Sequence, residues 1–278
     1  MAFVSFRRAD GSTSFGTLDG DWIVDLGAAP GAPVDLKAAI TAGALATLTS
    51  DTHLALAKVT LLPVLPNPGK ILCVGHNYES HRQETGRAKV DHPSIFTRFA
   101  DTLIAHGQPI IRPKASTDLD FEGELAIVIG TGGRAIAEAD ALSHIAGFAC
   151  FNDASVRDWQ WHTSQFAPGK NFPGTGALGP QLVTPDEAGD LADVHVVTML
   201  NGDVVQDQPI SDMIFPLAKI IAYTSAFTPL APGDVIATGT PGGVGAKRTP
   251  PLWMKAGDIV EVTIGPIGTL TNPVADEP

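Results

Sequence analysis

The sequence predicts a β-rich α+β fold. Most apolar runs are as short as strands, and several stop at a turn signal such as Asn201-Gly202. The 278 residues include 29 glycines and 22 prolines, which suit the many tight turns of a sheet protein. Hydrophobic residues make up 44% of the chain, which suffices for a sizeable core and argues against extensive disorder.

Residues 1–66 are expected to form a small N-terminal α/β domain. Alternating apolar and polar side chains with two Asp-Gly turns predict a meander of three strands, Ala2–Arg7, Ser14–Leu18 and Trp22–Asp25. Residues 35–57 are rich in alanine and leucine and predict two short helices around Ala42-Gly43. Three prolines between Leu61 and Gly69 can continue neither a helix nor a central strand, so we place a domain boundary there.

Residues 67–278 are expected to form the larger domain, in which strands dominate. The predicted strands are Lys70–Val74, Glu124–Ile129, Val194–Leu200, Asp234–Thr238 and Ile259–Ile264. The predicted helices are Glu79–Thr85, Ala137–Ser143, Val156–Thr163 and Ile214–Thr224. The last residues, Asn272–Pro278, are expected to fray.

Charge and composition exclude several classes of function. The formal net charge of −12 disfavours binding to nucleic acids and to anionic membranes. No apolar run approaches the ~18 residues of a membrane span, and the N-terminus lacks a signal peptide, so we expect a cytoplasmic protein. Cys73 and Cys150 are flanked by apolar residues and are expected to be buried thiols in a reducing compartment.

A cluster of carboxylates precedes the apolar run that follows residue 124. Residues 118–124 contain four acids, and Glu122 and Glu124 share one strand face because only Gly123 separates them. Their repulsion can be relieved by protonation or by a hard cation such as Mg²⁺, Mn²⁺ or Ca²⁺. The alternative interpretation is a solvated acidic turn before a strand.

Asp153 is the third carboxylate that such a cation would need. It follows the apolar run from Ile145 to Phe151, at the end of a second expected strand. Its alternative role is to cap the helix expected near Val156. Three carboxylates would leave two or three positions of a divalent cation open to a bidentate oxygen substrate.

Several other polar residues are candidates for the same site. His81 and Glu84 are one helical turn apart, so the carboxylate can orient the imidazole as a base; the alternative is an exposed helix pair. Arg157 and Gln160 share a helix face, which can equally be a surface face. Lys170 lies in a loop rich in glycine and proline, where a lysine is usually exposed.

From about Lys70 to Val274 the chain resembles the fumarylacetoacetate hydrolase family. Each matching stretch is weak alone, but their order and spacing are specific for the family. These stretches are Cys73–Tyr78, Asp120–Leu125, Phe151–Asp158, Asn201-Gly202, Met213–Phe215, Pro232–Ile236 and Thr238–Gly245.

The resemblance implies a catalytic domain of mixed, rolled β-sheets that is usually dimeric and binds one Mg²⁺ or Mn²⁺. It places the metal on Glu122, Glu124 and Asp153, and the catalytic His81-Glu84 pair on a mobile short helix. It also implies that Lys170 reaches the site, although many members have an aspartate where this chain has Pro173. The substrate-binding residues that it implies are Arg98, Arg157, Gln160 and Thr240.

The activity implied by the resemblance is hydrolysis of a C–C bond in a 1,3-dicarbonyl acid such as an acylpyruvate. His81 would take a proton from water, the hydroxide would add to the distal ketone, and Lys170 would stabilise the oxyanion. The products would be a carboxylate and a 2-oxo acid. The alternatives are an oxaloacetate-type decarboxylase, an isomerase or hydratase of 2-oxo-alkenoates in aromatic degradation, and a catalytically silent metal-binding scaffold.

Overall fold

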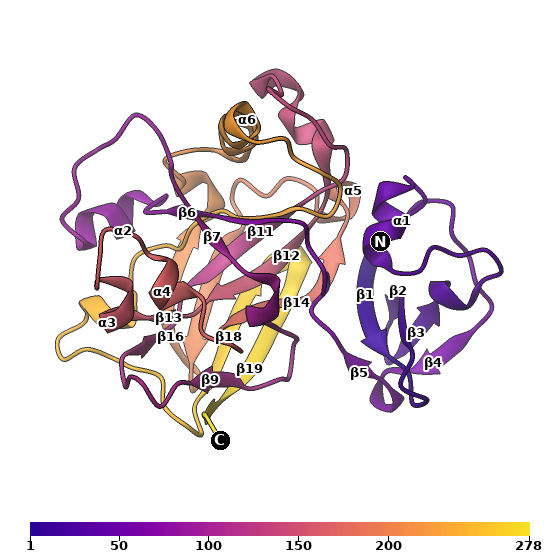
Figure 1. The fold of residues 1–278 in the computed structure, drawn as a ribbon, viewed down its shortest axis with the longest axis horizontal. Coiled ribbons are helices and arrows are strands. Elements are labelled where there is room, and N and C mark those ends of the chain that lie inside the picture. The colour runs from indigo at the N-terminus through magenta and orange to yellow at the C-terminus, as the bar shows by residue number, and fades with distance from the viewer.

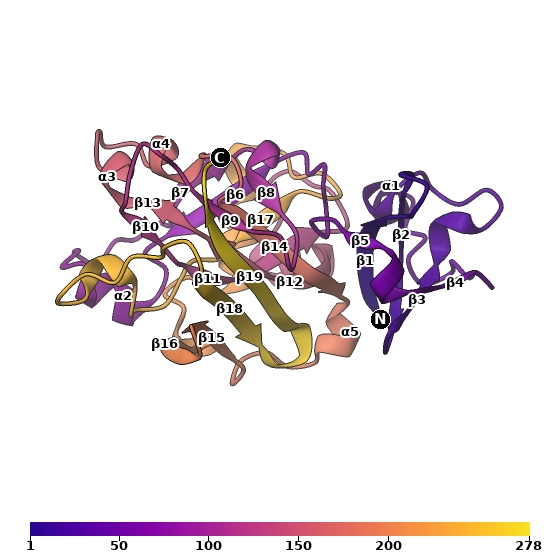
Figure 2. The same cartoon turned by 90° about the horizontal axis from the view of Figure 1, so that it is seen from below.

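The computed structural model describes residues 1–278, and it confirms the β-rich α+β fold. The N-terminal elements gather at one end of the molecule, and the remaining strands form the larger body beside them (Figures 1 and 2). Twelve strands form the main sheet, in the order β4-β3-β2-β1-β14-β12-β11-β17-β6-β7, with β5 paired to β1 and β8 to β14. The sheet therefore continues from the N-terminal part into the larger body through the pairing of β1 with β14.

The strands of the main sheet have the following bounds: β1 Ala2–Arg7, β2 Thr13–Asp19, β3 Trp22–Asp25, β4 His53–Ala55, β5 Thr60–Leu61, β6 Ile71–Gly75, β7 Ser94–Arg98, β8 Leu103–Ile104, β11 Gly123–Ile129, β12 Ile145–Asp153, β14 Gly176–Val183 and β17 Val235–Ala237. The three-stranded meander predicted at the N-terminus is confirmed.

A second sheet of five strands packs against the main one, in the order β16-β15-β18-β19-β9. Its strands are β9 Ile110–Arg112, β15 His195–Leu200, β16 Asp203–Pro209, β18 Ile259–Ile264 and β19 Gly268–Asp276. A short ribbon pairs β10 Leu119–Asp120 with β13 Ser155–Val156. The Asn201-Gly202 turn joins β15 and β16 as predicted.

Strand β11 is buried on both faces, which explains its uninterrupted apolar sequence. Leu125 and Ile127 belong to a core of 27 buried residues that includes side chains of the second sheet and of helix α6 (Leu217–Phe227). Ala126 and Val128 belong to a second core of 18 residues shared with the N-terminal strands. The start of β11 is therefore held rigidly from both sides, and this is where the acidic cluster lies.

The helices are short and lie around the sheets. They are α1 Leu36–Thr41, α2 Glu79–Glu84, α3 Arg157–Gln160, α4 Ala167–Lys170, α5 Pro185–Ala188 and α6. Three of them, α2, α3 and α4, lie at the end of the molecule opposite the N-terminal strands (Figure 1). None of the helices is both long and apolar enough to span a bilayer.

Three sequence predictions about local structure are corrected. Only one α-helix forms in residues 35–57, because Leu54 pairs with Ile23 and draws the later part into β4. Residues 272–276 do not fray but continue β19, where Val274 pairs with Ile110. The helix expected at 137–143 is a 3-10 helix, Glu138–His144.

Candidate active site

Sheet register brings the three predicted metal ligands together. In the antiparallel pair of β11 and β12, Gly123 lies opposite Asn152, so Glu122 lies opposite Asp153 at the strand ends. Opposite residues share a face, and Glu124 shares it too because it is two residues from Glu122. One carboxylate oxygen from each of the three side chains lies within 4.8 Å of the other two.

Gly123 is required because the second sheet passes close behind this strand. A Cβ at residue 123 would lie 2.1 Å from Oγ1 of Thr198, a residue of β15. The absence of a side chain at Gly123 therefore makes room for the second sheet on the face opposite the two acids.

Buried cations neutralise two of the three carboxylates. Lys170 Nζ donates to Glu122 at 2.7 Å and to Asp153 at 2.5 Å. Arg157 pairs with the other oxygen of Glu122 at 2.6 Å, and Arg98 pairs with Asp153. Burial opposes ionisation of Glu122, but Lys170 and Arg157 outweigh it and hold the pKa of its carboxyl below the ordinary value.

Glu124 is the one member of the triad without a cationic partner. Its carboxylate accepts a single hydrogen bond, from the Gly239 N–H at 2.8 Å, and the side chain is 2% exposed. Burial raises the pKa of Glu124 well above the ordinary value of 4.5, and Asp153 and Glu122 raise it further. This carboxyl therefore calls for either a proton or a metal ion.

The triad fits a hard divalent cation. All three donors are carboxylate oxygens, with no nitrogen or sulfur ligand among them, which favours Mg²⁺ or Mn²⁺ over zinc. A bound dication would also provide the positive charge that Glu124 lacks. This donor set can thus hold a divalent metal where the sequence predicts one.

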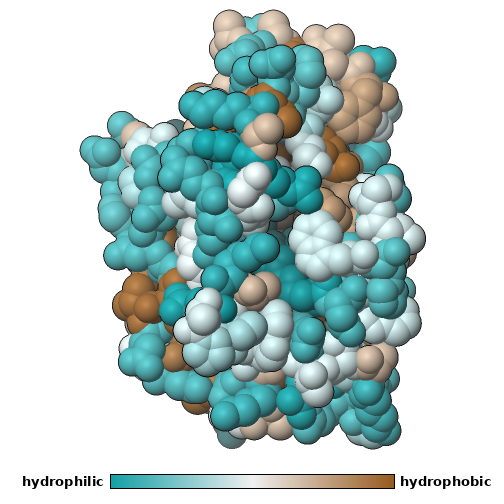
Figure 3. Space-filling model, turned by 90° about the vertical axis from the view of Figure 1, so that its left-hand side faces the viewer, coloured by the Kyte–Doolittle hydropathy of each residue, from teal (hydrophilic) through white to brown (hydrophobic).

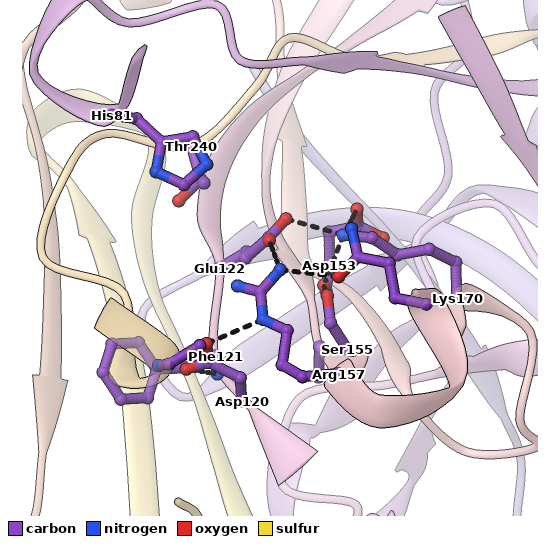
Figure 4. Close-up of polar contacts among 12 residues, drawn as sticks. His81, Asp120, Phe121, Glu122, Asp153, Ser155, Arg157, Lys170 and Thr240 are labelled. Atoms are coloured by element: carbon purple, nitrogen blue, oxygen red, sulfur yellow. Dashed lines mark hydrogen bonds and ion pairs between the residues drawn. The ribbon is translucent and has the colours of Figure 1, made fainter. Parts of the chain in front are cut away.

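Lys170 is buried, whereas a lysine in a loop is normally exposed. Burial alone would lower the pKa of its ammonium, but Asp153 and Glu122 outweigh this effect and raise it. Lys170 therefore keeps its charge and serves as a fixed cation, not as a base. Figure 4 shows it approaching Asp153 from the side opposite His81.

Helix α2 brings His81 to the same space. The His81 Nδ1 lies 3.1 Å from Glu84 Oε2, which confirms the predicted pair, and His81 is 4% exposed. A carboxylate only accepts hydrogen bonds, so this contact leaves the lone pair on Nε2. Glu84 also accepts the Gly243 N–H at 3.0 Å, and this second bond ties α2 to the glycine-rich loop.

A cavity of about 270 Å³ joins these groups. His81, Glu122, Glu124 and Lys170 line this cavity. Its other polar lining residues include Asp118, Arg157, Asp158, Gln160, Thr240 and Lys247. Its apolar walls include Phe96, Trp161, Phe166 and Trp253. The face that carries α2 and α3 is mainly hydrophilic and is hollowed near its middle (Figure 3). The size suits a small organic acid.

One nitrogen of the Arg157 guanidinium, Nη2, has no partner for its two N–H groups. Its Nε donates to Asp120 at 2.8 Å and its Nη1 to Gln160 at 2.8 Å, while Nη2 is buried without a partner. Figure 4 shows the guanidinium lying between Asp120 and Glu122. A buried unpaired donor is costly, so a carboxylate in the cavity would satisfy it.

Arg98 does not line the cavity, in contrast to the substrate contact expected from the sequence. It lies behind Asp153 and donates to the Ala154 carbonyl at 3.1 Å and to Thr175 at 2.6 Å. Both terminal nitrogens of its guanidinium are engaged in these contacts and in the pair with Asp153, while its Nε is buried without a partner, so Arg98 serves to fix Asp153. Asp153, in turn, binds cations and does not cap α3, whose first residue follows Val156.

Gln206 is a buried residue of the site that sequence reasoning missed. Its Oε1 accepts the Gly123 N–H at 3.0 Å, and its Nε2 donates to Thr240 Oγ1 and to the Pro241 carbonyl, each at 2.8 Å. Thr240 Oγ1 donates in turn to the Gly123 carbonyl at 3.0 Å. Gln206 thus joins β11, the strand that carries Glu124, to the loop at Thr240. These partners come from distant segments, so no local pattern marks it.

Asp120 was part of the acidic cluster without an assigned role. It is buried, binds Arg157, and accepts the N–H groups of Gly245 at 2.7 Å and Ala246 at 2.9 Å. It therefore supports both the arginine and the loop that follows Thr240.

Known proteins resemble this chain over most of its length. The model of the fumarylacetoacetate (FAA) hydrolase C-terminal family matches residues 70–275. Mitochondrial oxaloacetate tautomerase fahd2 of Xenopus laevis is 38% identical, over 99% of this chain and 90% of that protein. Oxaloacetate tautomerase YisK of Bacillus subtilis (strain 168) is 40% identical, over 79% of this chain and 74% of that protein. The solved structure of fumarylacetoacetate hydrolase from psychrophilic Exiguobacterium antarcticum superposes with a TM-score of 0.87 at 36% identity, covering all of both chains.

Proposed function

Because this chain belongs to the fumarylacetoacetate hydrolase family, we propose that it is a metal-dependent tautomerase of a small 2-oxo dicarboxylic acid of the oxaloacetate type. The names of the two relatives support proton transfer between keto and enol forms better than the C–C hydrolysis expected from the sequence. The cofactor in this proposal is Mg²⁺ or Mn²⁺.

The observation that carries this proposal is the position of His81 across one small cavity from the carboxylate triad. An acid whose carbonyl end lies at the triad would present its adjacent carbon to the far wall. His81, oriented by Glu84, is the base on that wall. It would remove a proton from this carbon, or return one to it, as the keto and enol forms interconvert.

The remaining cations hold the substrate and its developing charge. Arg157 Nη2 is available to the carboxylate next to the carbonyl group. Lys170, whose ammonium keeps its charge, lies where negative charge would develop on the carbonyl oxygen. A divalent cation bound at the triad would supply further charge stabilisation for that oxygen.

A second carboxylate on the substrate is favoured by Lys247. This residue lines the same cavity and forms no ion pair within the chain. The inner cations, by contrast, are already paired with Glu122, Asp153 and Asp120. An acid with a carboxylate at each end would therefore bridge Arg157 and Lys247.

The test is the decay of the ultraviolet absorbance of enol-oxaloacetate after it is mixed with enzyme and Mg²⁺ or Mn²⁺. Decay should exceed the metal-only blank, stop in EDTA and be lost in His81→Asn, which keeps metal binding. A wild-type rate equal to the blank at saturating metal would reject the proposal. Pyruvate release in the same samples separates tautomerisation from decarboxylation.

Hydrolysis is the second candidate function. The pair of His81 and Glu84 also suits activation of a water molecule, and one similar structure is named a hydrolase. Release of pyruvate from acetylpyruvate, with no effect on enol decay, would favour this candidate.

A further inference from the structure

His76 lies against the catalytic histidine and has no role in the proposed reaction so far. The His76 and His81 rings stack with centroids 5.0 Å apart and planes inclined by 11°. The edge of the His76 ring meets Phe166 at a centroid distance of 6.3 Å and an angle of 74°. His76 is thus fixed between His81 and the aromatic wall of the cavity.

The backbone holds His76 in an uncommon conformation. Its φ of 56° lies in the left-handed region, which is rare for residues other than glycine. The next residue, Asn77, is anchored in the core: its Nδ2 donates to the Thr238 carbonyl at 2.7 Å, and its Oδ1 accepts the Phe215 N–H at 2.8 Å. Such strain persists where surrounding contacts determine it, and it is frequent beside active sites.

The His76 ring is uncharged. Burial, which is the largest cause, and the neighbouring His81 and Arg87 together lower its pKa to about 3. A neutral ring does not repel the charge that His81 gains on accepting a proton, and its face attracts that charge. The other groups around His81 are Glu84 on its Nδ1 and Glu122 across the cavity.

We infer that His76 is a positioning residue for His81. Its stacked ring holds the His81 imidazole at the angle at which Nδ1 meets Glu84 while Nε2 remains free for the substrate. It also stabilises the imidazolium that forms during proton transfer. This inference rests on the proposed function, which makes His81 the base.

Two substitutions of His76 distinguish the effect of its stacked ring from the effect of its backbone conformation. His76→Asn removes the stack and suits the left-handed conformation, which asparagine tolerates. His76→Phe keeps a neutral, stackable ring without nitrogens. His92→Asn is the matched control, because His92 forms a similar stack with Tyr223, at 5.7 Å and 19°, outside the cavity.

In the enol-decay assay, kcat of His76→Asn should fall about 10- to 100-fold, as for a misplaced catalytic group, with KM changed less than about threefold. His76→Phe should recover kcat to within about threefold of wild type, and His92→Asn should match wild type. A wild-type kcat in folded His76→Asn would overturn the inference. So would a folded His76→Phe as slow as His76→Asn.

A second readout is independent of turnover. The Cε1 proton of His81 should show an upfield ring-current shift in the NMR spectrum of wild type and His76→Phe, and should lose it in His76→Asn. An equal chemical shift of this proton in wild type and His76→Asn would show that the two rings do not stack and would overturn the inference. If the wild type shows the shift but no enol decay, the proposed function fails while the stacking contact stands.

Discussion

Metal affinity should increase with pH because Glu124 must lose a proton to become a ligand. Glu124 has no cationic partner, and burial together with Asp153 and Glu122 raises the pKa of its carboxyl. Between its ordinary value of 4.5 and the raised pKa, the metal-free enzyme holds a proton there that a cation must displace.

The size of the effect follows from one displaced proton. Throughout this window the affinity for Mg²⁺ or Mn²⁺ should rise about tenfold per pH unit, which corresponds to roughly 1.4 kcal/mol. Above the raised pKa the affinity should level off. Lys170 keeps its charge in this scheme, since its two carboxylate partners raise its pKa.

Isothermal titration calorimetry at several pH values measures this dependence. Titrations at one pH in two buffers of different ionisation enthalpy should give one proton released per metal ion. Glu124→Gln cannot carry the proton, so its weaker binding should lose the pH dependence. A flat affinity profile in wild type, with no proton released, would refute the reasoning. Release of two protons would instead show that Lys170 also gives up its charge.

Three further predictions concern individual side chains. Gln206→Leu leaves its buried partners unsatisfied, so urea unfolding should show that the free energy of unfolding falls by about 1–3 kcal/mol. KM should rise as Thr240 shifts. Unchanged stability would mean that water replaces the amide. Lys247→Ala should raise KM for oxaloacetate about threefold but should not raise KM for a monocarboxylic 2-oxo acid. Lys255→Ala is the control. Equal effects on both acids would contradict the assignment of Lys247 to the second carboxylate of the substrate. Glu122→Ala should abolish metal binding in calorimetry and destabilise the metal-free protein by about 3–5 kcal/mol, because Lys170 and Arg157 each lose one of their two buried carboxylate partners. Retained activity in EDTA would remove the metal from the scheme.

Local periodicity in the sequence was enough to find two pairs of site residues: Glu122 with Glu124 on a strand, and His81 with Glu84 on a helix. The two-residue repeat of a strand placed Glu122 and Glu124 on one face, and the helical repeat placed Glu84 beside His81; both are confirmed. These relations depend only on the geometry of a single element, which the order of residues states directly.

Long-range pairing decided the rest of the site. Asp153 joins the triad because the β11–β12 register sets it opposite Glu122, and the sequence alone left it open as a helix cap. Arg98 was expected to contact the substrate, but its guanidinium binds Asp153 and Thr175 instead. Only the assembled sheets show this choice of partner.

The N- and C-terminal corrections have the same origin. Residues 53–55 have a composition that suits a helix, and the free edge of β3 recruits them as a strand. Residues 272–276 are polar enough to fray, but they extend β19 between β18 and β9. The sequence by itself determined the periodic elements and the acidic and histidine motifs. The tertiary structure decided which strand edges meet and which cation neutralises which acid, because these depend on contacts between segments far apart in the chain.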